Sequence, residues 1–386
     1  MGAMARSATL PPGPVTRRRI ASILLSLVAA VQVWLPAGAG AAERADPCNV
    51  RGVERVVAVG DVHGADERFL AILRAAGIVD GRGRWAGGRA HLVQTGDVVD
   101  RGPGSRKVID LLRRLEGEAR KAGGRVHALL GNHEAMWMLG DLRYVSPAEY
   151  DSFRTGSSEQ TRDRLYEAVS EQRRAQAEAA GEEFDEKAFR ERFLAELPLG
   201  AIELRREMAA DGRYGRWLRG LPTVVRIDGV MFLHGGLSPE VAPLGCAGIN
   251  QAVRKELAGD LDQIRATPAE ALVTREDGPL WYRGLAQNDE SAFAPQLEGL
   301  LRAAGARALV VGHTVAPGGK ITPRFGGRVI LLDTGMQPAY VPDGRAAALE
   351  IEDGRFTAIY EDGREVLGSV PGEPAPASPS PVPAPR

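Results

Sequence analysis

Residues 125–141 read RVHALLGNHEAMWMLGD. An apolar run stops at Gly131, and Asn132 and His133 follow it at once. A short apolar run that ends on a glycine is typical of a buried strand. Amide oxygens and imidazoles both bind metal ions. The stretch therefore predicts a strand whose carboxyl end carries metal ligands.

Two earlier stretches repeat this design. RVVAVGDVHG ends its apolar run before Asp61 and His63, and HLVQTGDVVDRG ends its run before Asp97. The first polar residues after the three runs stand 36 and 35 residues apart. This spacing is close to the length of a βαβ unit, which needs roughly 30 or more residues. We expect three parallel strands whose carboxyl ends lie side by side, where functional loops lie in such sheets.

The rest of the chain predicts further helices and strands. Apolar residues recur every three or four positions at 66–76 and 105–122, which indicates amphipathic helices. A turn at Asp228-Gly229 predicts a β-hairpin. Strands that alternate with helices indicate an α/β fold with a largely parallel sheet. The later strands are expected at 224–227, 230–233, 308–311 and 328–332, with two more before about residue 366.

The two ends of the chain differ from its middle. Residues 1–42 hold four arginines, no acidic residue, a short apolar segment and then small residues, which is the pattern of a secretory signal peptide. The apolar segment is shorter than the ~20 residues that span a bilayer, so we expect no stable membrane anchor after cleavage. The domain itself is expected at 43–367, with a charged helical insertion at about 147–220. The proline-rich residues 368–386 predict a disordered tail.

Net charge gives no sign of a nucleic-acid partner. The chain has 49 basic and 50 acidic residues, and without the signal 45 basic residues remain, for a net charge of −5. Cys48 and Cys246 are its only cysteines. They are either a disulfide pair, as an oxidising compartment allows, or two unrelated thiols. The signal pattern predicts a periplasmic or secreted protein.

Polar residues at the predicted strand ends indicate a metal centre. Four of the six histidines follow a strand, as do two aspartates and one asparagine: His63, His133, His234, His313, Asp61, Asp97 and Asn132. Oxygen and imidazole ligands without cysteine suit Mn, Fe, Zn or Co. Seven groups exceed the needs of one catalytic ion. We expect two ions about 3.5–4 Å apart that share one carboxylate, an arrangement suited to phosphoryl displacement. Arg101 would offer a planar fork to phosphate oxygens.

These motifs carry a family resemblance. GDVHG, GDVVDRG, GNHE, HGG and VGHT, in this order, resemble the calcineurin-like metallophosphoesterases, in their phosphoprotein phosphatase branch. GNHEAMWMLGDLRYVS, MFLHGGLSP, PLWYRG and LLDTGM are most similar to the Shewanella-like protein phosphatases. The resemblance covers about residues 53–366. It implies an α/β fold in which a two-sheet β-sandwich is flanked by helices.

The resemblance also implies roles for individual residues. The first metal site would be Asp61, His63 and Asp97, and the second Asp97, Asn132, His234 and His313. His133 would be the general acid, positioned by Asp100. Arg101 and Arg283 would hold the phosphate. Asp333 would lie next to this site or serve only in the turn after its strand, and we leave it outside the site.

The expected reaction is in-line attack on phosphorus by a metal-bridging hydroxide, with His133 protonating the leaving oxygen. A cysteine-based phosphatase is excluded, because neither cysteine opens a Cys-x5-Arg loop. The expected substrate is a phosphorylated protein, phosphotyrosine above all, or a small phosphoester. Trp281, Tyr282 and Trp137 would supply aromatic walls or, most of all for Trp137, core packing. Two alternatives are nucleotide or dinucleoside polyphosphate hydrolysis and non-catalytic binding of phosphorylated ligands.

Overall fold

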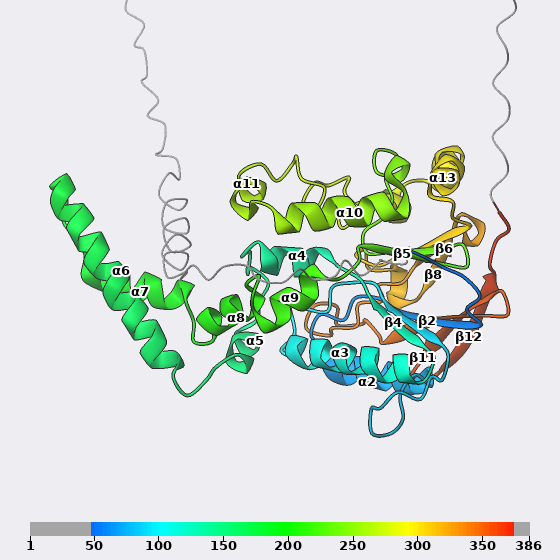
Figure 1. Ribbon diagram of the computed structural model, residues 1–386, viewed down its shortest axis with the longest axis horizontal. Helices are drawn as coiled ribbons and strands as arrows, with labels where there is room; N and C mark the ends of the chain where they lie inside the picture. Colours follow the sequence, from blue (N-terminus) through cyan, green and yellow to red (C-terminus); the bar gives the residue numbers. More distant parts are fainter. Residues whose placement is uncertain (1–47, 374–386) are drawn as a thin grey trace, which may run out of the picture. The chain divides into compact units, whose positions relative to one another are not determined.

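The computed structural model describes residues 48–373, and its strands form two six-stranded sheets (Figure 1). In the first sheet the order is β12-β11-β10-β2-β3-β4, and in the second it is β1-β5-β6-β7-β9-β8. The first sheet consists of β2 (Arg55–Val59), β3 (His91–Gln94), β4 (Arg125–Ala128), β10 (Ala347–Glu352), β11 (Arg355–Tyr360) and β12 (Gly363–Ser369). The second consists of β1 (Asn49–Val50), β5 (Val224–Ile227), β6 (Val230–Leu233), β7 (Ala308–Val311), β8 (Thr322–Arg324) and β9 (Val329–Leu331).

The three strands predicted to be parallel are confirmed. β2, β3 and β4 run parallel in one register, with Val59 level with Gln94 and Gln94 level with Ala128. Their carboxyl ends therefore lie at one edge of the sheet. The predicted hairpin is also confirmed, because β5 and β6 pair antiparallel around Asp228 and Gly229, both of which have positive φ.

Alternation along the strands divides the core into two layers. In β2, Val56 and Ala58 belong to the cluster between the two sheets, where Phe232 of β6 also lies. Val57 and Val59 point to the opposite face and join the cluster under the helices. Each fully buried side chain of this size contributes about 1.5–3 kcal/mol relative to an exposed one. The expected two-sheet α/β sandwich flanked by helices is confirmed.

Helices cover the outer faces of both sheets (Figure 1). α2 (Asp66–Ala75) and α3 (Ser105–Lys121) lie on the first sheet, and α10 (Gly245–Ala258) lies on the second, beside α13 (Glu290–Ala304). Their buried faces carry the predicted periodic residues, such as Ile72 of α2 and Leu112 of α3. The short helices outside the 147–220 stretch are α4 (Asn132–Met138), α11 (Leu261–Ala266), α12 (Gly284–Gln287), η1 (Ala242–Leu244), η2 (Pro317–Gly319) and η3 (Phe325–Gly327).

The expected insertion at about 147–220 is helical. It contains α5 (Pro147–Ser152), α6 (Ser158–Ala180), α7 (Glu186–Glu196), α8 (Ala201–Met208) and α9 (Arg213–Arg219). Only residues 159–197 form a separate compact unit, so the distinct part is narrower than the predicted stretch. Within that unit, α6 and α7 meet through ring contacts of Tyr166 with Phe189 and Phe193.

The chain ends with three strands where two were predicted, because β12 follows β11. β12 reaches Ser369, two residues into the predicted tail at 368–386. The predicted signal at 1–42 and the tail beyond residue 373 lie outside the described residues. Within residues 48–373, no helix is long and apolar enough to cross a membrane.

Cys48 and Cys246 form a disulfide, with their Cα atoms 5.9 Å apart. The disulfide alternative of the sequence analysis is therefore confirmed. It joins the segment that leads into β1 to the first turn of α10. Asn250 of the same helix donates to the carbonyl of Val224 and accepts from the backbone N–H groups of Thr223 and Val224. Together these contacts fix α10 against the edge of the second sheet.

Candidate metal centre and active site

Loops at the carboxyl ends of five strands bring the predicted site residues together. β2 leads to Asp61 and His63, β3 to Asp97, Asp100 and Arg101, and β4 to Asn132 and His133, while β6 leads to His234 and β7 to His313. Apart from Arg101, these side chains are buried. Of the eight non-glycine residues with positive φ in the described chain, five belong to this set: His63, Asp97, Asp100, Arg101 and His313. Backbone strain of this kind often marks a functional site.

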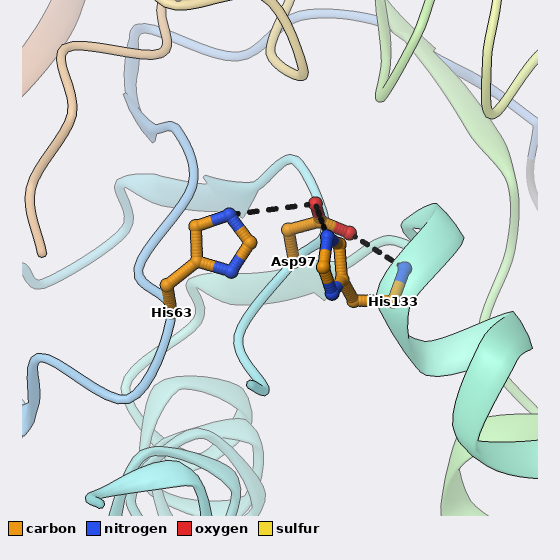
Figure 2. A group of neighbouring side chains, drawn as sticks. All are labelled: His63, Asp97 and His133. Atoms are coloured by element: carbon orange, nitrogen blue, oxygen red, sulfur yellow. Dashed lines mark hydrogen bonds and ion pairs between the residues drawn. The ribbon is translucent and has the colours of Figure 1, made fainter. Parts of the chain in front are cut away.

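The carboxylate of Asp97 lies at the centre of the cluster (Figure 2). Its Oδ2 is 3.7 Å from Nε2 of His63, 3.7 Å from Nε2 of His133 and 3.3 Å from Nε2 of His234. Two possible ligand groups share this residue, one with His63 and His133 and one with His234 and His313. A single carboxylate between two sets of imidazoles has the position that a bridging ligand requires.

Backbone carbonyls orient two of the imidazoles. Nδ1 of His63 lies 2.9 Å from the carbonyl oxygen of Val99, and Nδ1 of His234 lies 3.1 Å from that of Thr95. Because a carbonyl only accepts, each Nδ1 carries the hydrogen, and Nε2 faces the cluster. This is the usual arrangement of metal-binding histidines. Nε2 of His313 is buried and has no hydrogen-bond partner in the described residues, which fits a ligand position.

Burial and neighbouring charges set the protonation of these imidazoles. Burial lowers the pKa of His63 to about 3, and burial together with the charge of His234 lowers the pKa of His313 to about 2. Both rings are therefore neutral, as a ligand must be. Burial also opposes a charge on His234, but the carboxylates of Asp97 and Asp61 outweigh it and raise its pKa to about 9.

One further residue of each predicted metal site lies beside these imidazoles, Asn132 of the second site and Asp61 of the first. Oδ1 of Asn132 lies 2.8 Å from Nε2 of His234. The Asp61 carboxylate accepts the backbone N–H of His313 at 3.1 Å, and it lies 3.9 Å from Nδ1 of His234 and 4.0 Å from Nε2 of His63. The donor set of carboxylates, amide and imidazoles suits a pair of Mn, Fe or Zn ions. The residues present therefore fit the metals that the sequence predicts.

The imidazole of His133, the predicted general acid, is held by a carboxylate. Its Nδ1 is 2.5 Å from Oδ2 of Asp100, whose Oδ1 accepts from the indole N–H of Trp137 at 2.6 Å. Burial opposes a charge on the imidazole, but the carboxylate of Asp97 and the hydrogen bond to Asp100 outweigh it and raise the pKa of His133. Trp137 is itself buried, so it is a core residue that positions Asp100 and is no part of a substrate wall.

Two exposed tyrosines flank Arg101. Its guanidinium carbon lies 3.3 Å from the ring centroid of Tyr340 and 5.4 Å from that of Tyr144, within the range of cation–π interactions. The Tyr144 ring also lies 5.1 Å from that of His133. Nη2 of Arg101 is 3.4 Å from Nε2 of His133, so the arginine lies beside the acid. Sequence reasoning missed both tyrosines, because they stand in loops without periodicity.

Arg283 lies on the other side, beside His313. Its Nη1 donates to the carbonyl of His313 at 2.9 Å and to Oγ1 of Thr314 at 3.0 Å. Trp281 packs edge-on against the His313 ring, with centroids 5.7 Å apart, and its indole N–H donates to Val273. Trp281 therefore supports the predicted metal ligand His313. The two arginines approach the centre from different loops.

Two buried carboxylates complete the surroundings. Glu134 accepts the backbone N–H groups of Gly131, Asp97 and Val98 at 2.8–2.9 Å, and so holds the loop that carries the central carboxylate. Sequence reasoning quoted this glutamate without assigning it a role. Burial raises the pKa of Asp333 to about 6, and burial together with the charge of Asp333 raises the pKa of Asp61. Asp333 combines the two roles left open for it, because its carboxylate accepts the backbone N–H of Gly335 in the turn after β9 and its charge acts on Asp61.

This fold and site define a class of protein. A family model described as calcineurin-like phosphoesterase matches residues 54–317, and the chain belongs to that family. It is a metal-dependent phosphatase.

Several proteins are similar over most of the chain. An uncharacterised protein of Schizosaccharomyces pombe is 33% identical, covering 79% of this chain and 80% of its own length. Shewanella-like protein phosphatase 2 of Arabidopsis thaliana is 29% identical, covering 77% of this chain and 75% of its own length. The crystal structure of a cold-active protein-tyrosine phosphatase from a psychrophilic Shewanella species has a TM-score of 0.63 and 29% identity, covering 83% of this chain and 82% of its own.

Proposed function

We propose that this protein is a dinuclear phosphomonoester hydrolase that acts on phosphorylated proteins and prefers phosphotyrosine. The observation that carries the proposal is the shared carboxylate of Asp97, faced by His63 on one side and His234 on the other. Two groups of possible ligands share this carboxylate, which provides for two ions and not for one. The first ion would be held by Asp61, His63 and Asp97, and the second by Asp97, Asn132, His234 and His313. Two such ions supply the Lewis acidity that lowers the pKa of water and offsets phosphoryl charge.

The chain's own residues account for the rest of the reaction. The forks of Arg101 and Arg283 bind the phosphoryl oxygens and orient the ester. His133 presents Nε2 beside Arg101, while Asp100 holds its Nδ1. A protonated imidazole in this place can donate its Nε2 hydrogen to the leaving oxygen. The raised pKa keeps that proton available near neutral pH.

Two observations support phosphotyrosine as the preferred substrate. Solved structures similar to this chain include those of cold-active protein tyrosine phosphatases. Tyr144 and Tyr340 are among four large apolar or aromatic side chains that are exposed in the described chain, at 44% and 45%, and both contact Arg101. Aromatic rings on both sides of the phosphate-binding arginine favour an aryl leaving group. They take the place that the sequence analysis gave to Trp281 and Tyr282.

We further propose that the protein acts in the periplasm or outside the cell. The basic, apolar and small-residue regions of residues 1–42 support export. The disulfide between Cys48 and Cys246 supports it independently, because such bonds persist mainly in oxidising compartments.

A substrate panel tests the proposed function. The measurement is kcat/KM of the Mn²⁺-loaded protein for a phosphotyrosine peptide, the matching phosphoserine peptide, phenyl phosphate and a dinucleoside polyphosphate. We expect the phosphotyrosine peptide to be the best of the four. Phenyl phosphate controls for the intrinsic ease with which a phenol leaves. A peptide no better than phenyl phosphate, or a dinucleoside polyphosphate better than both, would overturn the protein-phosphatase proposal.

A further inference from the structure

A polar cavity lies at the amino ends of the parallel strands of the first sheet, opposite the metal centre. Its volume is about 410 Å³, and it is lined by residues that precede or begin β2, β3 and β4, among them Arg51, Arg89, His91 and Arg125. The metal ligands follow the other ends of these strands. At about 3.3 Å per residue, the six residues from His91 to Asp97 separate the two places by roughly 20 Å. We call this cavity the arginine pocket.

The three arginines of the pocket have free side chains. Arg51, Arg89 and Arg125 are all exposed, and none of them forms an ion pair or a side-chain hydrogen bond with any residue in 48–373. The neighbouring Arg55 differs, because it pairs with Glu350 at 2.6 Å. Three unpaired guanidinium groups from three separate chain segments thus line one cavity. Three positive charges around one cavity favour an anion between them.

Nearby acidic groups leave a net positive charge at the pocket. Among the lining residues, Glu54 is the one carboxylate, against three arginines. Asp228 also lies close by and adds a second negative charge, but its carboxylate accepts the backbone N–H groups of Gly52 and Val53 at 2.7 and 2.8 Å and pairs with none of the three arginines. Burial and the charge of Arg125 lower the pKa of His91, against the opposing charge of Asp228, so the neutral ring adds no positive charge of its own to the pocket.

A larger cavity on the surface of α3 shows the contrast. Its volume is about 560 Å³, and basic residues line it as well. Three of them are already paired: Lys107 with Asp66, Arg114 with Glu118 and Arg213 with Asp110. That surface is a network of ordinary ion pairs. The arginine pocket lacks such partners within the described chain, and this lack points to a ligand.

We propose that the arginine pocket binds a phosphate group, distinct from the one hydrolysed at the metal centre. A phosphate dianion has enough acceptor oxygens to bind three arginine side chains, whereas a single carboxylate has only two oxygens. The group is either free phosphate, the product of the reaction, or a second phosphorylated residue of a protein substrate. The latter source rests on the proposed function. In that case the pocket retains a multiply phosphorylated protein while another phosphoester is hydrolysed.

Charge reversal with a matched control tests the site itself. Inorganic phosphate is titrated calorimetrically into the metal-loaded protein, and its inhibition constant against p-nitrophenyl phosphate is measured in parallel. We expect two phosphates per chain, of which one competes with substrate. R89E/R125E should weaken the non-competing site at least tenfold and leave the inhibition constant and turnover unchanged. R82E/R120E reverses two exposed charges outside the pocket and should leave both sites within twofold.

The possible outcomes separate the two proposals. A single phosphate that competes fully with substrate, or a second site that R89E/R125E leaves intact, would overturn the arginine pocket as a phosphate site. Neither result depends on which substrate the enzyme prefers. A failure of the substrate panel would leave this titration unaffected.

Peptides distinguish the two sources of phosphate. One peptide carries two phosphotyrosines about 20 residues apart, long enough to reach around the domain at about 3.3 Å per residue, and its partner carries one. If a substrate phosphoryl group occupies the pocket, R89E/R125E should raise KM at least threefold for the first peptide alone. If both KM values stay unchanged while the titration loses its second site, the pocket holds free phosphate.

Discussion

At the scale of single residues, other groups of the protein hold the side chains of the site in position. Asp97 has a positive φ and is held by Glu134, while carbonyls fix His63 and His234 with their Nε2 atoms facing inward. Despite burial, the carboxylates of Asp97 and Asp61 raise the pKa of His234 to about 9. Metal binding therefore has to displace a proton but does not have to build the site, which makes metal affinity fall at low pH.

Asp97→Asn is expected to release more than one metal ion per chain. The amide has the size of the carboxylate but cannot offset the charge of two cations, so both sites weaken together. Metal content after dialysis is the measurement. Asp353→Asn is a suitable control, since Asp353 also has a positive φ but lies in the turn between β10 and β11. Retention of two ions and full activity in the Asp97 variant would contradict the bridging role.

His133→Ala is expected to keep its metals and to lose rate according to the leaving group. The loss should be about 10²–10⁴-fold for alkyl phosphates and much smaller for p-nitrophenyl phosphate, whose anion needs little protonation. Because the pKa of His133 is raised, activity should persist above the ordinary histidine range and fall as the pH rises through that pKa. Trp137→Phe removes a donor that stabilises the charged Asp100 carboxylate, so this carboxylate should hold the imidazole proton more strongly and the alkaline limb should move to higher pH. Equal losses for all leaving groups would argue against an acid.

Tyr144→Ala is expected to reduce selectivity and leave chemistry intact. The ring packs at an angle against His133 and lies near Arg101, without a side-chain hydrogen bond to either. Loss of an aromatic contact of about 0.5–1.5 kcal/mol corresponds to about 2–10-fold in kcat/KM for phosphotyrosine over phosphoserine peptide. Tyr282→Ala serves as the control and should affect both peptides alike. An unchanged ratio in Tyr144→Ala would exclude this ring from substrate selection.

At the scale of helices and strands, prediction succeeded where a buried apolar run ends on a glycine. β5, β6 and β7 were predicted with their observed bounds. β12 was missed because its residues are mostly exposed and include Arg364 and Glu365, as suits an edge strand that must not attract another chain. β1 is too short, at two residues, to give a pattern.

The junction of α3 and α5 contains a contact that sequence periodicity does not reveal. α3 has no side-chain cap and no acidic residue in its first turn. Glu149 of α5 supplies the acceptor, bonding the backbone N–H of Ser105 at 3.1 Å, and Ser152 donates to its other oxygen. The helix start thus depends on a residue 44 positions later. Burial raises the pKa of Glu149 to about 6.

Glu149→Gln is expected to flatten the pH dependence of stability. Folded Glu149 holds its proton more tightly than the unfolded chain, whose pKa is about 4.5. The folded state therefore binds more protons between pH 4.5 and 6, and the free energy of unfolding falls as pH rises through this window, by on the order of 2 kcal/mol. Denaturant melts across this range should show a smaller fall in the variant. An exposed control, Glu365→Gln, should keep the wild-type slope.

At the scale of the whole catalytic unit, the site draws on both sheets. The predicted metal ligands, His133 and Arg101 could be named from sequence because each follows a recognisable strand end, whereas Arg283 precedes α12 and was named from the family resemblance. Spacing alone did not separate ligand from acid, and the family resemblance supplied that distinction. Tyr144 and Tyr340 lie 196 residues apart and meet only around Arg101, so no local pattern could pair them.

The disulfide is a constraint on the whole catalytic unit, and its removal is expected to cost stability without changing catalysis. Cys48 and Cys246 are 198 residues apart, and in the entropy model closing so long a loop contributes up to about 5 kcal/mol. Their nearest polar contacts are Val224 and Asn250, which belong to the junction of β5 and α10 and not to the metal centre.

Cys48→Ser/Cys246→Ser should lower the urea midpoint by an amount equivalent to about 2–5 kcal/mol and keep kcat within twofold. Reducing the wild-type protein should give the same shift, which separates the bond from the substitutions. Mass spectrometry of non-reduced digests provides the direct measurement. Two free thiols in protein purified from the oxidising compartment, or an unchanged midpoint, would show that the pair does not stabilise the exported enzyme.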